Sequence, residues 1–225
     1  MRGEFLGMWG GSQEGGRLAV AQLGEGFTAE MFVPVWTSQL LASDWVQTDT
    51  PPLSASLVPQ GPNLKVSVRN ELDRPLTDLR LAWKDQIFLL GEVKAKSAAE
   101  FTLDRDKGEL LAPFVQRHAG HWQQFVQRRQ QAFGSDQSRW LALDSTNVTA
   151  ATFVGQFPGP GQNQRHFVHP AGLELSSLVE RGNAVLLAWD AGHAPVPSMK
   201  RFKTVRSQQN TMYRLAIPIG AGGAN

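Results

Sequence analysis

The sequence predicts a mainly β protein: an antiparallel β-sandwich with one substantial amphipathic helix, at about residues 111–133, packed against it. Three observations support this fold class. Apolar residues alternate with polar ones in several short segments, and glycine and proline are plentiful, with 22 and 13 of the 225 residues. One segment breaks this pattern with apolar spacings of three, four and seven. Alternation puts every second side chain of a strand on the same face, so each strand is expected to bury one face.

The clearest strand signal lies between residues 63 and 103. Leu64, Val66 and Val68 alternate with polar residues, and residues 70–75 then supply the side chains of a tight turn. The apolar positions that follow are Leu79, Leu81, Trp83, Ile87, Phe88, Leu89, Leu90, Phe101 and Leu103. This region is expected to form an antiparallel sheet with one buried face, and its pattern indicates no catalytic group.

Further strands are expected on both sides of this region. They are residues 18–20, 27–36 and 53–57 before it, and residues 140–143, 151–154, 184–189 and 213–219 after it. Pro34 favours an edge or a bulge for the second of these. The run 184–189 is continuously apolar, which is typical of a strand covered on both faces. A short helix is expected at 173–181, where Gly182 would end it.

The segment from 111 to 133 carries the helical pattern. Its apolar positions are Leu111, Phe114, Val115, Trp122, Phe125, Val126 and Phe133. Pro113 suits the first turn of a helix, and Gly134 suits the residue just past its end. The opposite face is rich in glutamine, so the helix is expected to cover one end or face of the sheet.

The composition limits the classes of partner. The hydrophobic fraction of 41% is ordinary for a globular protein, and the formal net charge is only +2, with Lys and Arg spread along the chain. A nucleic-acid partner is therefore not expected. The absence of cysteine removes disulfides and thiolate metal sites, and it fits either cytoplasm or bacterial periplasm. No apolar segment approaches the roughly 20 residues of a membrane span, so this segment itself is not expected to insert into lipid.

The expected organisation is one domain between two tails. Residues 1–16 and 220–225 are glycine-rich and are expected to be flexible tails, and residues 17–219 form a single sandwich-like domain. Two subdomains, 17–103 and 140–219, joined by the helix, are the alternative.

Two stretches resemble a known group of proteins. Residues 68–76 and 89–93 resemble the N-x-L-x-x-P-L … L-G-x-L hairpin in extracytoplasmic portions of uncharacterised bacterial multi-pass membrane proteins. Residues 186–189, the loop with Pro195 and Pro197, and residues 212–218 resemble the region that closes those portions before a membrane span. Together they cover about a third of the chain. The resemblance implies a β-sandwich module outside the membrane and no activity, and it does not extend to the glutamine-rich helix.

The histidines are the candidate metal ligands. Four of the five form two pairs of identical spacing: His118 with His121, and His166 with His169. Neutral imidazole is a common metal ligand, and residues three apart share a helix face, so a further histidine or Asp190 could complete a site. Against this, Gly120 weakens the helix, and the second pair would face opposite ways on a strand. Surface or packing histidines are favoured and no cofactor is expected, while a metal-dependent hydrolase stays an alternative.

The tryptophans suggest another alternative. The chain has seven tryptophans and one tyrosine. Trp83 and Trp189 lie in apolar strands and Trp122 on the apolar helix face, so these three are expected in the core. Trp36 and Trp45 lie beside serine, threonine and aspartate residues and are freer to stack on a sugar ring. A carbohydrate-binding module is therefore the second alternative.

No acid, base, nucleophile or cofactor motif converges in this sequence. The expected function is a non-enzymatic binding or assembly module, extracytoplasmic and attached to the membrane in a full-length bacterial protein. Its expected location is the periplasm or the cell surface. Its expected partner is a protein or a membrane protein.

Overall fold

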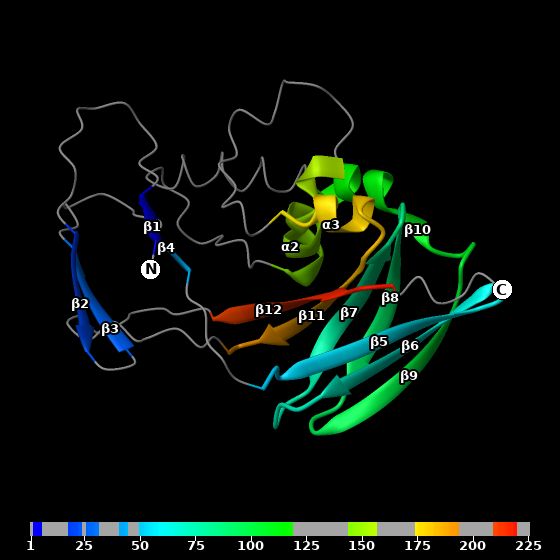
Figure 1. Ribbon diagram of the computed structural model, residues 1–225, viewed down its shortest axis with the longest axis horizontal. Helices are drawn as coiled ribbons and strands as arrows, with labels where there is room; N and C mark the ends of the chain where they lie inside the picture. The colour runs from blue at the N-terminus through cyan, green and yellow to red at the C-terminus, as the bar shows by residue number, and fades with distance from the viewer. Residues whose placement is uncertain are drawn as a thin grey trace, which may run out of the picture.

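The computed structural model describes residues 2–5, 18–23, 26–31, 41–44, 50–118, 144–156, 174–193 and 209–219. These residues form mainly antiparallel strands, with short helices gathered on one side (Figure 1). Two larger sheets, of three and five strands, build the body of the fold. The mainly β fold class predicted from the sequence is confirmed.

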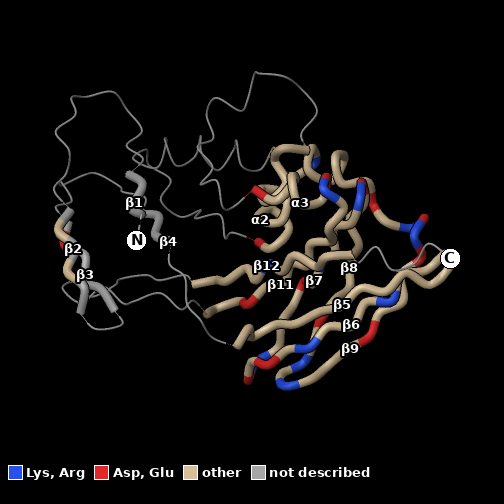
Figure 2. The backbone as a smooth tube through the Cα atoms, in the orientation of Figure 1, with Lys and Arg blue, Asp and Glu red and all other residues tan. Residues whose placement is uncertain are grey.

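The three-stranded sheet consists of β5 (Leu53–Gln60), β6 (Asn63–Asn70) and β9 (Ser97–Asp104), with β6 in the middle. Leu64, Val66 and Val68 are buried, as the alternation predicts, because they share the inner face of β6. Lys65 and Ser67 lie on the opposite face. Figure 2 shows basic and acidic residues along β6 and β9, so this sheet has one apolar face and one polar face.

The five-stranded sheet contains strands from distant parts of the chain. In order across the sheet they are β10 (Glu109–Leu110), β8 (Gln86–Val93), β7 (Leu76–Trp83), β11 (Ala184–Ala191) and β12 (Asn210–Ile217). β11 pairs with both β7 and β12, so strands from both expected subdomains share one sheet. The division of the chain into domains and tails stays a prediction.

The region 63–103 does not form one continuous sheet. β6 pairs with β5 and β9, whereas β7 pairs with β8 and β11, so residues 71–75 cross from one sheet to the other. The turn residues were recognised correctly, but alternation alone does not say whether two successive strands pair with each other.

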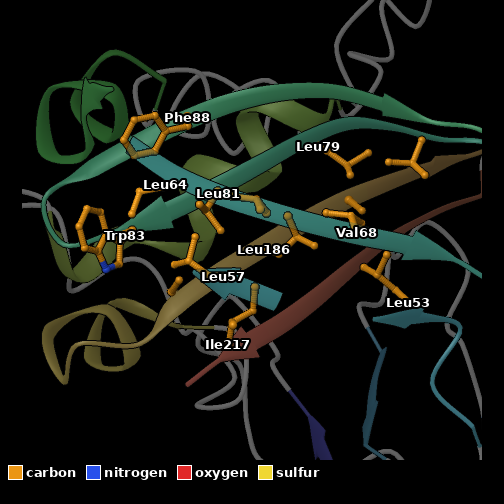
Figure 3. Packing of buried hydrophobic residues seen from close by; sticks show 14 of the residues in the cluster. Leu53, Leu57, Leu64, Val68, Leu79, Leu81, Trp83, Phe88, Leu186 and Ile217 are labelled. Carbon is orange, nitrogen blue, oxygen red and sulfur yellow. The ribbon is translucent and has the colours of Figure 1, made fainter. Parts of the chain in front are cut away.

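The inner faces of the two sheets form the main core. Leu64 of β6, Leu81 of β7 and Leu186 of β11 are fully buried and point into a shared interior (Figure 3). The other buried members of this cluster are Leu53, Leu57, Val66, Val68, Leu76, Leu79, Trp83, Phe88, Val93, Ala184, Ala188 and Ile217. Two sheets packed face to face in this way make the predicted sandwich.

A helical layer covers the other face of the five-stranded sheet (Figure 1). It consists of residues 111–118, α2 (Ser145–Thr152), η1 (Val154–Gln156) and α3 (Ser176–Glu180). Leu111, Phe114 and Phe153 pack against Val185 and Leu187 of β11 in a second buried cluster. β11 is thus covered on both faces, as its continuous apolar run predicts. Residues 111–118 of the predicted helix are helical, and residues 119–133 lie outside the described residues.

One predicted strand is wrong. Residues 151–154 end α2 and begin η1, because Asp144 starts a helix by accepting a hydrogen bond from the backbone nitrogen of Asn147 at 2.7 Å. A run of four apolar and β-branched residues cannot by itself distinguish a strand from a helix. The neighbouring predicted strand, 140–143, lies outside the described residues. The short helix before Gly182 is confirmed as α3, and the positive φ of 85° at Gly182 suits glycine after a helix end.

Two two-stranded sheets complete the described strands. β2 (Leu18–Leu23) pairs with β3 (Gly26–Met31), and β1 (Arg2–Phe5) pairs with β4 (Leu41–Asp44). The first pair agrees with the strands predicted to begin near residues 18 and 27. β1 and β4 were not predicted.

Candidate functional site

The predicted site residues fall mostly outside the described part of the chain. Those outside it are Trp36, Trp45, His121, His166 and His169. His118 lies in the helical segment 111–118, with its ring centroid 4.8 Å from that of Phe114. Within the described ranges, no three His, Cys, Asp or Glu side chains gather as a metal site would require. The carbohydrate and metal alternatives stay predictions.

The tryptophans predicted to lie in the core do so where they are described. Trp83 and Trp189 are each 8% exposed. The ammonium nitrogen of Lys84 lies 4.5 Å from the ring centroid of Trp83, and the guanidinium carbon of Arg105 lies 5.6 Å from it. Such contacts stabilise a cation over an aromatic face, so the ring of Trp83 serves local structure.

Buried polar side chains gather at one end of the sandwich. Here the chain leaves β6, passes from β8 to β9, leaves β11 and enters β12. We call this region the loop end and define it as residues 70–75, 94–96, 190–193 and 209–213. Two buried polar side chains, Asn70 and Asp190, organise it.

Asn70 forms hydrogen bonds to both the β6–β7 and the β8–β9 connections of the loop end. Its side chain is fully buried, and its Nδ2 donates to the carbonyl oxygens of Arg74 at 2.8 Å and Lys94 at 3.1 Å. Its Oδ1 accepts from the backbone nitrogen of Leu72 at 2.9 Å. A buried amide must be satisfied by the protein, and these partners lie in two different loops. One side chain thereby fixes both loops to the end of β6.

Asp190 is the buried charge of the loop end. It lies at the end of β11 and is 2% exposed. Its Oδ2 accepts from Nε of Arg74 at 2.8 Å, although 116 residues separate the two in sequence. This hydrogen bond holds the pKa of Arg74 above its usual value, against the opposite effect of burial. The pair therefore joins the β6–β7 connection to the carboxyl end of β11.

His193 is held by the same carboxylate. Its Nδ1 lies 3.1 Å from Oδ1 of Asp190 and 3.1 Å from the carbonyl oxygen of Ala191. Both atoms are acceptors, so we assign the proton of the neutral ring to Nδ1, which leaves Nε2 as an acceptor. The ring is 54% exposed. The hydroxyl of Thr211 donates to the carbonyl oxygen of His193 at 2.8 Å, which joins the ends of β11 and β12.

Tyr213 completes the cluster from β12. It lies opposite Ala188 and packs partly buried against the main core. Burial raises the pKa of the phenol above its ordinary value of 10.0, and the negative charge of Asp190 acts in the same direction. The positive charge of Arg74 acts in the opposite direction. The neutral phenol is therefore favoured next to the ion pair.

The loop end is suited to recognition through hydrogen bonds on a fixed backbone. The charge of Asp190 is matched by Arg74, while the side chain of His193 is exposed and, in its neutral ring, has Nε2 as an acceptor. Asp73 and Lys94 are exposed in the loops that Asn70 anchors. Loops that a scaffold holds in place in this way carry binding surfaces in many folds.

Only faint signals of this arrangement are present in the sequence. From the sequence, Asp190 is a candidate only for an extra metal ligand, while Asn70 and Arg74 belong to the turn 70–75 and to the stretch that carries the resemblance. An acidic residue directly after a continuously apolar strand is the signal that could have been used, because a charge at such a position needs a buried partner. The identity of that partner could not be read from the sequence.

Comparison with protein families, with curated proteins and with solved structures finds no match to this chain. None of the helices in the described ranges has the length and apolarity of a membrane span.

Proposed function

We propose that the chain is a non-enzymatic binding or assembly module and that the loop end is its recognition surface. One observation carries the proposal: the buried Asp190 joins Arg74 and His193, which belong to connections far apart in sequence. In β-sandwich domains, the loops at one end of the two sheets are a common place for recognition. A surface with this support presents its side chains in one arrangement, which reduces the ordering cost of binding a partner.

We also propose that the module works outside the cytoplasm, attached to a membrane in the full-length protein, with a protein or membrane protein as its partner. The resemblance of residues 68–76 and 89–93 to extracytoplasmic portions of membrane proteins supports this location. The β-sandwich fold is compatible with it but does not by itself define a function.

The recognition surface can be tested with single cysteines, because the chain contains none. Asp73→Cys places a thiol at the loop end, and Asp85→Cys places one in the exposed turn between β7 and β8, at the other end of the sandwich. Each variant of the full-length protein is treated in cells with a thiol-directed photo-crosslinker. A discrete cross-linked product from Asp73→Cys alone is expected. Equal products from both positions, or none from Asp73→Cys, would contradict the proposed surface.

The same two variants test the location. A membrane-impermeant maleimide added to intact cells, with the outer membrane permeabilised where there is one, is expected to label both cysteines before lysis. The unsubstituted protein reports any labelling elsewhere in the full-length chain. Labelling of Asp73→Cys and Asp85→Cys only after lysis would place the module in the cytoplasm and remove the location from the proposal.

A further inference from the structure

A second polar cluster lies between β7 and α2, where the helical layer covers the five-stranded sheet. We call it the Arg80 cluster and define it as Asp78, Arg80, Ser145, Thr146 and Thr149. Nη2 of Arg80 donates to the hydroxyl of Thr146 at 2.9 Å, and the hydroxyl of Ser145 donates to Oδ2 of Asp78. α2 therefore meets the sheet partly through hydroxyl groups.

Two polar atoms of this cluster are buried without a hydrogen-bond partner in the described structure. They are Nε of Arg80 and Oγ1 of Thr149. Thr149 is fully buried, and no carboxylate of the described residues forms an ion pair with Arg80. The guanidinium instead lies 5.3 Å from the ring centroid of Phe114. An unmatched donor beside an apolar ring is costly unless a further group accepts its hydrogen bond.

The helical periodicity directs Thr149 toward β7. Thr149 follows Ser145 by four residues and Thr146 by three, so its side chain projects between theirs on the same side of α2. Ser145 and Thr146 both reach side chains of β7. Thr149 therefore lies on the side of α2 whose residues contact β7.

The chemistry of these atoms defines what would satisfy them. An arginine Nε can only donate, and a threonine hydroxyl can donate as well, so the common partner must be an acceptor. The positive charge of Arg80 favours a negative one. We propose that the Arg80 cluster binds a small oxyanion of the phosphate or sulfate type, with Arg80 Nε and Thr149 Oγ1 as donors.

Two acidic residues oppose such an anion. Asp78 is held by Ser145, and Asp144 accepts from the backbone and side-chain nitrogens of Asn147 at 2.7 and 2.8 Å. Their charges reduce the affinity, so the site is expected to need an oxyanion present well above trace concentration. Arg80 remains the group that gives the cluster its preference for an anion over water.

The test is the melting temperature of the purified chain in sodium phosphate, with sodium chloride at matched ionic strength as reference. At five times the dissociation constant the folding equilibrium rises about sixfold, which corresponds to about 2–4 °C for a domain of this size. Arg80→Gln is expected to abolish the phosphate-specific rise, and the isosteric Thr149→Val to reduce it. Arg69→Gln, at an exposed arginine of β6 paired with Glu71, is the matched control and should keep it. Parallel titrations with sulfate and acetate define which oxyanions bind.

Two results would overturn the proposal. One is a melting temperature that is the same in phosphate and chloride. The other is a phosphate-specific rise in melting temperature that Thr149→Val leaves unchanged. This second result overturns the proposal even if Arg80→Gln does not fold. If Thr149→Val raises the melting temperature equally in both salts, its hydroxyl is an unpaired buried group that contacts no anion, and the oxyanion site is excluded. Because no loop-end residue is altered, failure here leaves the proposed recognition surface untouched.

Discussion

The two sheets of the sandwich differ in how many of their faces the protein covers. β6, the middle strand of the three-stranded sheet, and β11, an interior strand of the five-stranded sheet, are both eight residues long. Along β6 buried inner-face residues alternate with more accessible ones, whereas β11 is buried from Ala184 to Asp190. The helical layer accounts for the difference, since it covers the face of β11 that has no counterpart in β6.

The number of covered faces determines where a charged side chain needs a hydrogen-bond or ion-pair partner from the protein. On the open face of the three-stranded sheet, Lys65 and Glu100 form an ion pair at 3.0 Å while both remain accessible to water. In the five-stranded sheet, Asp190 and Arg80 lie against protein on most sides and depend on specific partners. Burial makes an unpaired charge expensive, and the charged residues Asp190 and Arg80, one in each proposed site, both belong to the sheet with two covered faces.

The largest expected effect is on the free energy of unfolding, and it compares a residue under the helical layer with one on the open face of β6. Leu187→Ala removes a fully buried side chain between β11 and the helical layer and should lower the free energy of unfolding by about 3 kcal/mol. Ser67→Ala, on the outward face of β6, should change it by about 0.5 kcal/mol or less. Urea unfolding of both variants measures the difference. Similar losses in the two would mean that the helical layer is not packed as a second core.

The next effect compares a buried carboxylate with an exposed one. Asp190→Asn keeps the volume but replaces one acceptor oxygen with a donor that faces Arg74 or His193, so we expect a loss of about 2 kcal/mol. Glu100→Gln breaks an ion pair in water and should lose less than about 1 kcal/mol. Guanidinium unfolding at neutral pH gives both values. If Asp190→Asn loses no more than Glu100→Gln, the ion pair does not hold the loop end together.

The smallest effect concerns Tyr213, at the margin of the covered sheet. Its folded pKa is raised above 10.0, so its contribution to stability is complete below pH 10 and is lost as the pH rises through the folded pKa. Tyr213→Phe should remove this part of the alkaline destabilisation. Because Tyr213 is the sole tyrosine, phenolate absorbance near 295 nm follows it alone. A midpoint at or below pH 10 would contradict its burial beside Asp190.

Much of the fold followed from the residues themselves. The continuous apolar run at 184–189 predicts a strand with two covered faces, and β11 has them. The prediction of a strand at 151–154 is wrong because the side chain of Asp144, which starts α2, lies outside the four-residue run that favours a strand. The loop end could not be predicted, since nothing near Asp190 in the sequence points to Arg74 as its partner.

The sequence by itself determined which face of strands such as β6 is buried and where several elements begin and end. Those properties depend on the periodicity and caps of residues close together in the chain. Tertiary structure alone decided that β7 pairs with β11, that helices cover one sheet, and that Arg74 neutralises Asp190. These contacts join residues about a hundred positions apart, and their register depends on how whole sheets pack, which no local pattern specifies.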